Sequence, residues 1–386
     1  MRILHVITSL RTGGAEKLMV ELLPRLKKTL SPLPLYGEGC HPDGYLTSHL
    51  SSLTLEMDVK LLVFDGVRTP FYEELERRGV KIHSFGENCS VYNPLFVFRL
   101  IPFLRQFDIV HTHNTACQMF VAMANVFVGT RIVTTEHNTS NRRRGKWYWK
   151  MIDKWMYRQY SDIICISDQT EVNLREHLAN DEGICGKIKT VYNGVDVRSF
   201  VEALPLDVDK ASKYIIAMVA AFRPQKDQDT LVKAIARLPK QKYELWLVGG
   251  GSEREEIVKQ LAKDLGIADR VKFLGIRNDI PSIVKTADVV VLSSHYEGLS
   301  LSSIEGMASG KPFIASDVDG LHEIVNGYGI LVPHEDDKAL AEAIKKCCED
   351  KEYAAEVGKK CQVRAMMYDI SVMAEGYNDV YKELMS

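Results

Sequence analysis

Glu297 and Glu305 stand eight positions apart in a segment that also carries a glycine and several hydroxyl side chains. The order of residue types predicts a strand, a loop and then a helix. Gly298 permits close backbone approach to a ligand, and the amides of Gly298, Leu299 and Ser300 would meet it at the start of that helix. Free amides and the helix dipole favour an anion. The segment therefore predicts a diphosphate cradle that works without a metal ion.

The two carboxylates of this segment can accept hydrogen bonds from hydroxyl groups. One could face a sugar while the other faces a ribose. A simpler interpretation stays open at this point, because Ser302 and Glu305 match the S-x-x-E pattern of a helix capping box. Glu297 would then be a solvated loop charge.

A second group of candidate residues directly follows the strand expected at 214–220. Arg223 and Lys226 lie in this loop, where cations would face the same diphosphate. A leaving diphosphate develops negative charge as its bond breaks, and fixed cations stabilise that charge. The alternative is a pair of solvated surface cations. Gly249 opens a run of three glycines after the strand expected at 243–248, which either lines a ligand crevice or makes a simple turn.

In the N-terminal half, Gly13 and Gly14 follow a strand expected at 2–8 and open a helix expected at 14–28. Their amides can meet a phosphate or a second substrate, although a plain turn is also consistent with the pattern. A dinucleotide site would need G-x-G-x-x-G here, and the chain has only the paired glycines. An NAD-dependent oxidoreductase is therefore the weakest of the enzyme classes considered.

The strand expected at 108–113 carries two histidines on one face, because side chains alternate along a strand. His113 lies nearer the carboxyl edge, where open sheets bind ligands, and is the candidate for the active site. His111 is better explained as an interior histidine whose nitrogens are satisfied. His137 follows the next strand and is expected to border the second substrate.

The elements that position these residues alternate between short β-branched runs and helical-period segments throughout the chain, which predicts an α/β fold. Two such series are visible, each typical of a doubly wound, Rossmann-like domain. An acidic, Pro205-containing stretch at 201–213 reads as the linker between them, and 29–57 reads as an exposed insertion. We expect domains at 1–205 and 206–365, followed by a C-terminal helix at 366–386.

The composition limits the class of protein. The 386 residues include 49 basic and 51 acidic side chains, and the formal net charge of −2 gives no overall field that would recruit nucleic acid. No stretch reaches the ~18 apolar residues of a membrane span. The eight cysteines lack zinc or C-x-x-C spacing, which fits free thiols in a reducing compartment. We expect a cytoplasmic protein.

Taken in its setting, the stretch from Glu297 to Glu305 resembles the E-x₇-E signature of the retaining GT-B glycosyltransferases of family 4, and the resemblance covers nearly the whole chain. It implies two Rossmann-like domains that face a central cleft, with the acceptor on the N-terminal domain and the nucleotide sugar on the C-terminal one. The last helix would cross back onto the N-terminal domain.

The resemblance also implies roles for individual residues. Glu305 would bind the donor ribose, and Glu297 and His113 would contact the donor sugar. Residues around Arg277 would read the nucleotide base, and Gly249 would line the donor crevice. The family usually has an arginine where this chain has Ala221, so Arg223 would have to replace it beside Lys226.

The implied activity is transfer of a hexose or N-acetylhexosamine, with retention, from a nucleotide sugar to a hydroxyl of a glycan or lipid-linked acceptor. UDP is the favoured nucleotide and surface polysaccharide the favoured product. No metal and no cofactor is expected. Two alternatives stay open: a nucleotide-sugar epimerase of similar fold, and a noncatalytic nucleotide-sugar-binding protein.

A basic, aromatic segment runs from Arg142 to Lys150, at the start of an expected helix. Cations interleaved with tryptophan and tyrosine suit an anionic membrane surface. We therefore predict peripheral contact with the inner face of the plasma membrane, with a solvated protein face as the alternative.

Overall fold

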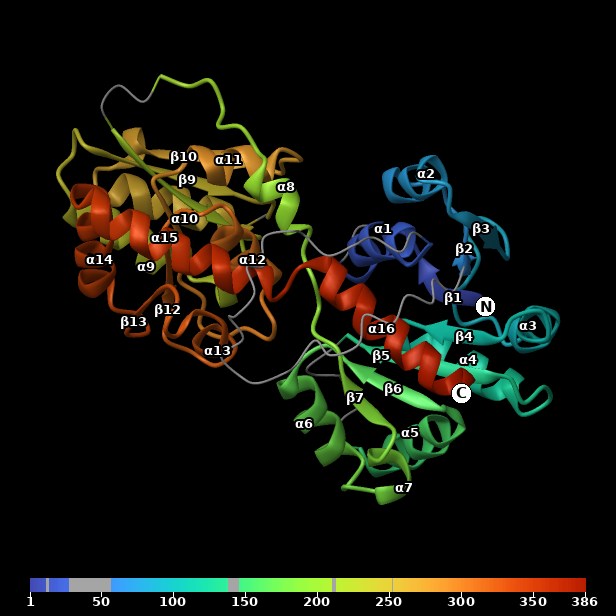
Figure 1. The fold of residues 1–386 in the computed structure, drawn as a ribbon. Coiled ribbons are helices and arrows are strands. Elements are labelled where there is room, and N and C mark those ends of the chain that lie inside the picture. The colour runs from blue at the N-terminus through green and yellow to red at the C-terminus, as the bar shows by residue number, and fades with distance from the viewer. Residues whose placement is uncertain (12–13, 28–56, 138–145, 210–212, 252) are drawn as a thin grey trace. The chain divides into compact units, whose positions relative to one another are not determined.

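The computed structural model describes residues 1–11, 14–27, 57–137, 146–209, 213–251 and 253–386 (Figure 1). The described residues form two compact units. Unit 1 comprises Met1–Tyr192 together with Ile370–Ser386, and unit 2 comprises Asn193–Asp369.

Unit 1 is built on a parallel sheet whose described strands follow the order β3-β2-β1-β4-β5-β6-β7. The order reverses beside β1, which pairs with β2 on one edge and with β4 on the other. The strands are β1 Arg2–Ser9, β2 Asp58–Asp65, β3 Lys81–Ser84, β4 Ile109–Thr112, β5 Arg131–Glu136, β6 Asp162–Cys165 and β7 Ile188–Thr190.

Helices cover both faces of this sheet. Side chains of β1 therefore alternate between two apolar cores, one on each face. Leu4 and Val6 enter the core shared with α3 Phe96–Leu104, α4 Thr115–Asn125 and α5 Trp147–Gln159. Ile3 and Ile7 enter the core shared with α1 Gly14–Lys27, α2 Pro70–Arg77 and α16 Ile370–Met385. The remaining helices of unit 1 are α6 Asp168–His177 and α7 Glu182–Cys185. In Figure 1 the red helix α16 runs beside these blue and green strands.

Unit 2 is built on a second parallel sheet with the described strand order β10-β9-β8-β11-β12-β13. Here the order reverses beside β8, which pairs with β9 and β11. The strands are β8 Tyr214–Val219, β9 Tyr243–Val248, β10 Val271–Gly275, β11 Val289–Leu292, β12 Phe313–Ser316 and β13 Ile330–Val332.

The helices of unit 2 pack as two groups, as doubly wound connections require. One group is α9 Gln228–Arg237, α10 Glu253–Asp264 and α14 Asp337–Glu349, and the other is α8 Val197–Val201, α11 Ile280–Thr286, α12 Leu301–Ala308, α13 Leu321–Val325 and α15 Lys351–Met366. Two short 3₁₀ turns complete the unit, η1 Pro224–Lys226 and η2 Ala268–Arg270.

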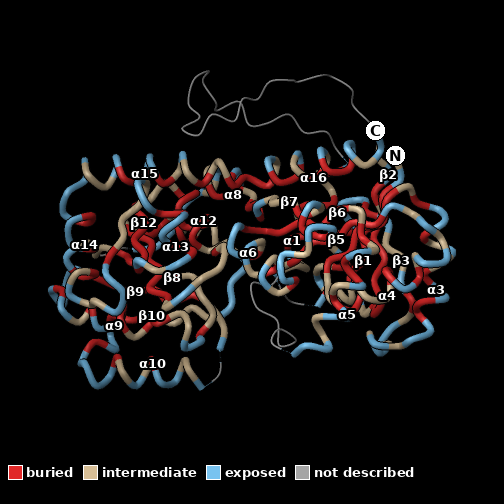
Figure 2. The backbone as a smooth tube through the Cα atoms, turned by 90° about the horizontal axis from the view of Figure 1, so that it is seen from below, coloured by how far each residue is buried: buried red, intermediate tan, exposed pale blue. Residues whose placement is uncertain are grey.

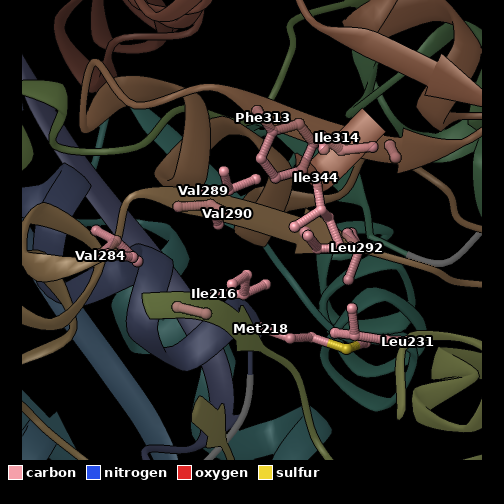
Figure 3. Packing of buried hydrophobic residues seen from close by; sticks show 14 of the residues in the cluster. Ile216, Met218, Leu231, Val284, Val289, Val290, Leu292, Phe313, Ile314 and Ile344 are labelled. Carbon is pink, nitrogen blue, oxygen red and sulfur yellow. The ribbon is translucent and has the colours of Figure 1, made fainter. Parts of the chain in front are cut away.

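The central strands of both units are buried along most of their length, whereas the edge strands β3, β7, β10 and β13 are only partly buried. The outer faces of the helices are exposed (Figure 2). In unit 2 a single apolar cluster joins the sheet to its helices, and Figure 3 shows Ile216 of β8 and Val289 of β11 within it. Burial on both faces explains why these strands are continuous apolar runs rather than alternating ones.

The fold class is confirmed, since each half contains a doubly wound parallel sheet. The position of the linker is wrong. Residues 193–205 belong to unit 2, because Lys285 Nζ donates to Val201 O at 3.2 Å and Leu206 N donates to Thr286 Oγ1 at 2.7 Å. The return to unit 1 comes at Ile370 rather than at 366. Residues 29–56 of the insertion expected at 29–57 lie outside the described residues.

Candidate active site

The loops that carry Lys226 and Glu297 follow the two strands at which the sheet order of unit 2 reverses. β8 ends at Val219 and β11 ends at Leu292, and the two strands are neighbours. In open α/β sheets, ligands bind outside the carboxyl ends of strands at this switch point. The topology therefore places both loops at the expected binding edge of the sheet.

The side chains of Lys226 and Glu297 meet directly. Lys226 Nζ lies 2.5 Å from Glu297 Oε1, and Ser294 Oγ donates to the same carboxylate oxygen at 2.6 Å. The lysine and glutamate side chains are only 17% and 7% exposed. Two sequence motifs that are 71 positions apart therefore form one largely desolvated ion pair.

The backbone around this ion pair is held by hydrogen bonds between the two loops. His295 N donates to Gln225 O at 2.8 Å, and Gln225 Nε2 donates to Tyr296 O at 2.8 Å. Ser293 Oγ donates to Asp227 O at 2.7 Å. Asp227 adopts a left-handed conformation, with φ of 44°, and its carboxylate caps α9 by accepting from Thr230 N at 3.2 Å.

The start of α12 differs from a capping box. Ser300 is the N-cap residue and Ser302 already lies inside the helix, so the S-x-x-E alternative does not describe this helix. Glu305 is buried, with 9% of its surface exposed.

The 317–320 turn approaches the Glu297 loop closely. Gly320 has a φ of 80°, and a Cβ there would lie 2.4 Å from Glu297 O, so only glycine permits this approach.

The other predicted donor residues lie in different settings. Gly249 has a φ of 154°, and a Cβ would lie 2.1 Å from Ala220 O, so the glycine permits close packing of the two loops after β8 and β9. Arg277 forms a paired contact with Asp279, at 2.8 and 2.6 Å. Arg223 is exposed and, in the described part of the chain, has no side-chain hydrogen bond or ion pair. Arg223 is therefore available to a ligand, whereas Arg277 would first have to leave Asp279.

In unit 1 the switch point lies between β1 and β4, and histidines gather there. His5 of β1 faces His111 of β4 in the strand register. His113 Nε2 lies 2.8 Å from His5 Nδ1, and His113 Nδ1 lies 3.3 Å from His137 Nε2. Their rings stack, with centroids of His111 and His113 4.4 Å apart.

The chain of hydrogen bonds continues into the C-terminal helix. Tyr381 OH lies 3.4 Å from His5 Nε2 and 2.6 Å from His111 Nδ1. His111 Nε2 meets Thr135 Oγ1 at 2.7 Å, which confirms the prediction that His111 is a satisfied interior histidine. Thr135 Oγ1 in turn meets Tyr377 OH at 3.0 Å. Both tyrosines belong to α16, so the end of the chain completes this network.

Burial determines the charge of these histidines. It lowers the pKa of His5 to about 3 and that of His137 to about 4. Burial, followed by the neighbouring imidazoles, also holds the pKa of His111 and of His113 well below the ordinary value. All four rings are neutral at pH 7, so each donates one hydrogen bond and accepts one. The cluster suits uncharged hydroxyl groups and supplies no positive charge to a phosphate.

The paired glycines are only partly described. Gly14 opens α1, and a Cβ there would meet no atom within 4 Å. Gly13 lies outside the described residues.

The basic, aromatic segment from Arg142 to Lys150 is also only partly described, because residues 138–145 lie outside the described residues. Lys146 to Lys150 are described, with Trp147 78% exposed at the start of α5.

Comparison with known proteins supplies the family. The family model "Glycosyl transferases group 1" matches residues 207–364, and the model "Glycosyltransferase Family 4" matches residues 45–199. Together these matches account for most of both units. The chain belongs to the family 4 glycosyltransferases. The retaining GT-B resemblance seen in the sequence is thereby confirmed.

Two curated relatives of this glycosyltransferase cover most of its length. It is 25% identical over 373 residues to UDP-Gal:alpha-D-GlcNAc-diphosphoundecaprenol alpha-1,3-galactosyltransferase of Escherichia coli, which covers 91% of this chain and 89% of the relative. It is 28% identical over 272 residues to N-acetyl-alpha-D-glucosaminyl L-malate synthase of Bacillus anthracis, with 66% and 69% covered.

The fold is also that of a solved relative. The structure of Anabaena Alr3699/HepE in complex with UDP superposes with a TM-score of 0.80 at 20% identity, covering 99% of this chain and 100% of that one. At this identity the likeness supports the GT-B fold and does not assign residues.

Sequence reasoning missed several residues that shape the site. His5 lies within the strand expected at 2–8, and Tyr377 and Tyr381 lie within the expected C-terminal helix, but no local pattern marks these three as site residues. Gly320 and Ser294 were not singled out. A histidine at the centre of an otherwise aliphatic first strand, in register with His111, was the one available signal for His5.

Proposed function

We propose that this glycosyltransferase transfers a hexose or N-acetylhexosamine, with retention, from a UDP-sugar to a hydroxyl of a glycan or lipid-linked acceptor in surface polysaccharide synthesis. The ion pair between Lys226 and Glu297 carries the proposal, because it joins the loops after β8 and β11 at one edge of the sheet. A cation beside a carboxylate can serve a diphosphate and a sugar hydroxyl together. The relatives that act on UDP-galactose and bind UDP favour the nucleotide.

In the proposed reaction unit 2 holds the donor. Lys226 and Arg223 neutralise the diphosphate, with help from the amides of Gly298, Leu299 and Ser300. Glu305 binds the ribose and Glu297 binds the sugar. The bond between the anomeric carbon and the diphosphate breaks, the acceptor oxygen bonds to that carbon from the same face, and the hydroxyl proton passes to the diphosphate. No protein base and no metal is needed for this chemistry.

Unit 1 is assigned to the acceptor, with His137 and Gly13 beside it and His113 directed to the reacting sugar. Its neutral histidines suit hydroxyl groups, because their pKa values are lowered by burial. Arg277 and Gly249 are assigned to the base and the donor crevice.

The decisive experiment screens the full chain against UDP-, GDP- and ADP-sugars in EDTA, following thermal stabilisation and slow release of the nucleoside diphosphate. We expect one UDP-sugar to stabilise and to be hydrolysed, with both signals lost in Glu305→Ala and kept in Glu323→Ala, an exposed carboxylate of α13. No stabilisation by any nucleotide sugar would refute the assignment. Isomerised donor without an acceptor would instead identify an epimerase, and binding without turnover a noncatalytic protein.

We further propose that the enzyme works in the cytoplasm on the inner face of the plasma membrane. Trp147, Met151 and Trp155 recur every four residues along α5 and are 78%, 63% and 40% exposed. Lys146 and Lys150 flank this stripe. Exposed tryptophan beside lysine favours an anionic bilayer. Among the described helices, none is long and apolar enough to cross a membrane.

Flotation with vesicles tests this docking surface. We expect the full chain to float with anionic vesicles and not with purely zwitterionic ones. Flotation should fall at least fivefold in Trp147→Ser/Met151→Ser and in Arg142→Ala/Arg143→Ala/Arg144→Ala. The matched control is Lys359→Ala/Lys360→Ala on α15. Unchanged flotation of both test variants would exclude this surface as the membrane contact.

A further inference from the structure

Three loops at the carboxyl edge of the unit 2 sheet bring metal-ligating atoms together outside the proposed catalytic residues. His295 follows β11, and His334 and Glu335 follow β13. His295 Nδ1 lies 2.7 Å from His334 Nε2 and 3.3 Å from Glu335 Oε1, and His334 Nε2 lies 4.0 Å from Glu335 Oε1. Two imidazoles and a carboxylate thus face one point.

A buried carboxylate lies beside this group of three ligand atoms. Asp227 is 4% exposed, and its Oδ2 is buried without a hydrogen-bond partner in the described structure. This oxygen lies 4.0 Å from His295 Nδ1. An unpartnered buried carboxylate oxygen is costly, because its lost hydration is not replaced. A cation bound by the two histidines and Glu335 would compensate it.

The geometry fits a small tetrahedral ion. Zinc binds histidine nitrogen and carboxylate oxygen at about 2.0–2.1 Å, which places neighbouring ligand atoms about 3.3 Å apart. The separations of 2.7, 3.3 and 4.0 Å among the three ligand atoms bracket this value, and the fourth position would be open to water. The rings of His295 and His334 are nearly perpendicular, at 84°, so their nitrogens can converge without stacking. Without an ion, the 2.7 Å contact is a hydrogen bond between the rings.

Backbone conformation supports the same assignment. Asp227 and Glu335 both adopt left-handed conformations, with φ of 44° and 59°. Such conformations are unfavourable for residues with a Cβ and cluster at functional sites. One of the three candidate ligands, Glu335, and the neighbouring Asp227 therefore both have strained backbone conformations.

The buried histidine trio of unit 1 is a poorer candidate for a metal. His5, His111 and His113 also lie within ligand distance of one another. Their rings stack, however, with the planes of His5 and His113 only 8° apart. Each of their ring nitrogens already takes part in the hydrogen-bond chain to His137, Thr135 and Tyr381. No ring nitrogen of the trio is left to bind an ion.

We propose that His295, His334 and Glu335 bind one divalent transition-metal ion of the zinc class, with the buried carboxylate of Asp227 beside His295 as its nearest additional negative charge. Imidazole and carboxylate ligands select zinc, cobalt or nickel over magnesium, which prefers six oxygen ligands. Asp227 adjoins Lys226, and His295 lies two residues before Glu297. The ion would fasten the loop after β13 to the loop after β11, which carries Glu297, and it would have no part in bond breaking.

Zinc binding by the full, untagged chain tests the proposal, after dialysis against EDTA and by competition with a chromophoric chelator. We expect one zinc ion per chain, an intensely coloured four-coordinate cobalt derivative and no competition from magnesium. Affinity should fall at least tenfold in His334→Ala and in Asp227→Asn, whose amide oxygen still caps α9. The control His322→Ala removes an exposed histidine of the same unit, paired with Asp317 at 2.6 Å.

Metal-free thermal midpoints near the wild-type value would show that the variants are folded. If wild type binds no zinc, or if His334→Ala and His322→Ala bind it as tightly as wild type, the site does not exist. This result is independent of the donor screen, which is run in EDTA.

Discussion

Lys226 Nζ and Glu297 Oε1 lie 2.5 Å apart, and each of these atoms belongs to a loop proposed to hold the donor. Because of this pair, neither side chain is an isolated charge before the donor binds. Lys226 orients the carboxylate of Glu297, while Ser294 donates a second hydrogen bond to the same oxygen. A donor diphosphate would then meet a lysine that is already fixed in place, which reduces the ordering cost of binding.

The ion pair predicts strong coupling between its two members. Lys226→Met should lower donor turnover about 100-fold, the usual effect of removing one preorganised charge-stabilising group. Glu297→Gln in the Lys226→Met background should then cost much less than it does alone, because residues that act together are not additive. Nucleoside diphosphate release measures both effects. Lys263→Met, at an exposed position of α10, is the control, and fully additive losses would contradict the coupling.

The hydroxyl of Tyr381 should contribute to the stability of unit 1 beyond the burial of its ring. Tyr381→Phe leaves His111 Nδ1 and His5 Nε2 without their shared partner, and unsatisfied buried groups cost about 1–3 kcal/mol each. The free energy of unfolding of unit 1 should fall by a similar amount. Urea unfolding in a Trp246→Phe background reports unit 1, since the other tryptophans, 147, 149 and 155, lie there. Tyr92→Phe is the exposed control and should be neutral.

The histidine cluster predicts loss of stability in acid. An unfolded histidine binds a proton near pH 6.5, whereas burial lowers the pKa of His5 to about 3. As the pH falls below about 6.5, His5 therefore binds a proton in the unfolded state but stays unprotonated in the folded state. Each such histidine removes about 1.4 kcal/mol of stability per pH unit over this window, and the stability is fully present above it.

The acid dependence is measured by urea unfolding between pH 7 and pH 5 in the same Trp246→Phe background. His5→Gln should lower the slope of unfolding free energy against pH by the contribution of one histidine. His322→Gln, an exposed change in unit 2, should leave the slope as it is. Equal slopes for His5→Gln and its parent would contradict the neutral state of His5.

Gly249 is predicted to tolerate no side chain. A Cβ would lie 2.1 Å from Ala220 O, at a φ of 154°, so Gly249→Ala should destabilise unit 2 by about 3 kcal/mol or more. Gly327 also has a positive φ, of 82°, but no atom lies within 4 Å of its would-be Cβ. Gly327→Ala should therefore cost only about 1–2 kcal/mol. Unfolding followed by Trp246 fluorescence, with the three tryptophans of unit 1 replaced by phenylalanine, separates the two.

The sheets could be predicted because their strands are buried on both faces and appear as apolar runs. Expected strands at 243–248 and 214–220 differ by at most one residue from β9 and β8. β7 and β13 were missed, because each has only three residues and no distinct pattern. The linker was misplaced for a related reason: polarity and Pro205 mark a surface segment, but contacts with α11 and α12 assign residues 193–205 to unit 2.

The candidate site was predictable where a residue follows a strand, and not where it depends on contact across the fold. Lys226 and Glu297 could each be chosen from local pattern, although nothing in the sequence shows that their side chains meet. His5 and Tyr381 are 376 positions apart, and only the packing of α16 against the first sheet joins them. Asp227 reads as an ordinary helix cap, and its second, unpartnered oxygen becomes visible only in three dimensions.

The place of α16 in unit 1 also has a consequence for biosynthesis. Unit 2 is continuous in sequence, so the ribosome delivers all of it before the last helix is translated. Until then, the apolar face formed by Ile3, Met19 and Leu22 lacks Met373, Tyr377 and Tyr381, which bury it. The first half of the chain can therefore finish folding only after α16 has been translated, and a stop codon before Ile370 would leave an open core rather than a shorter enzyme.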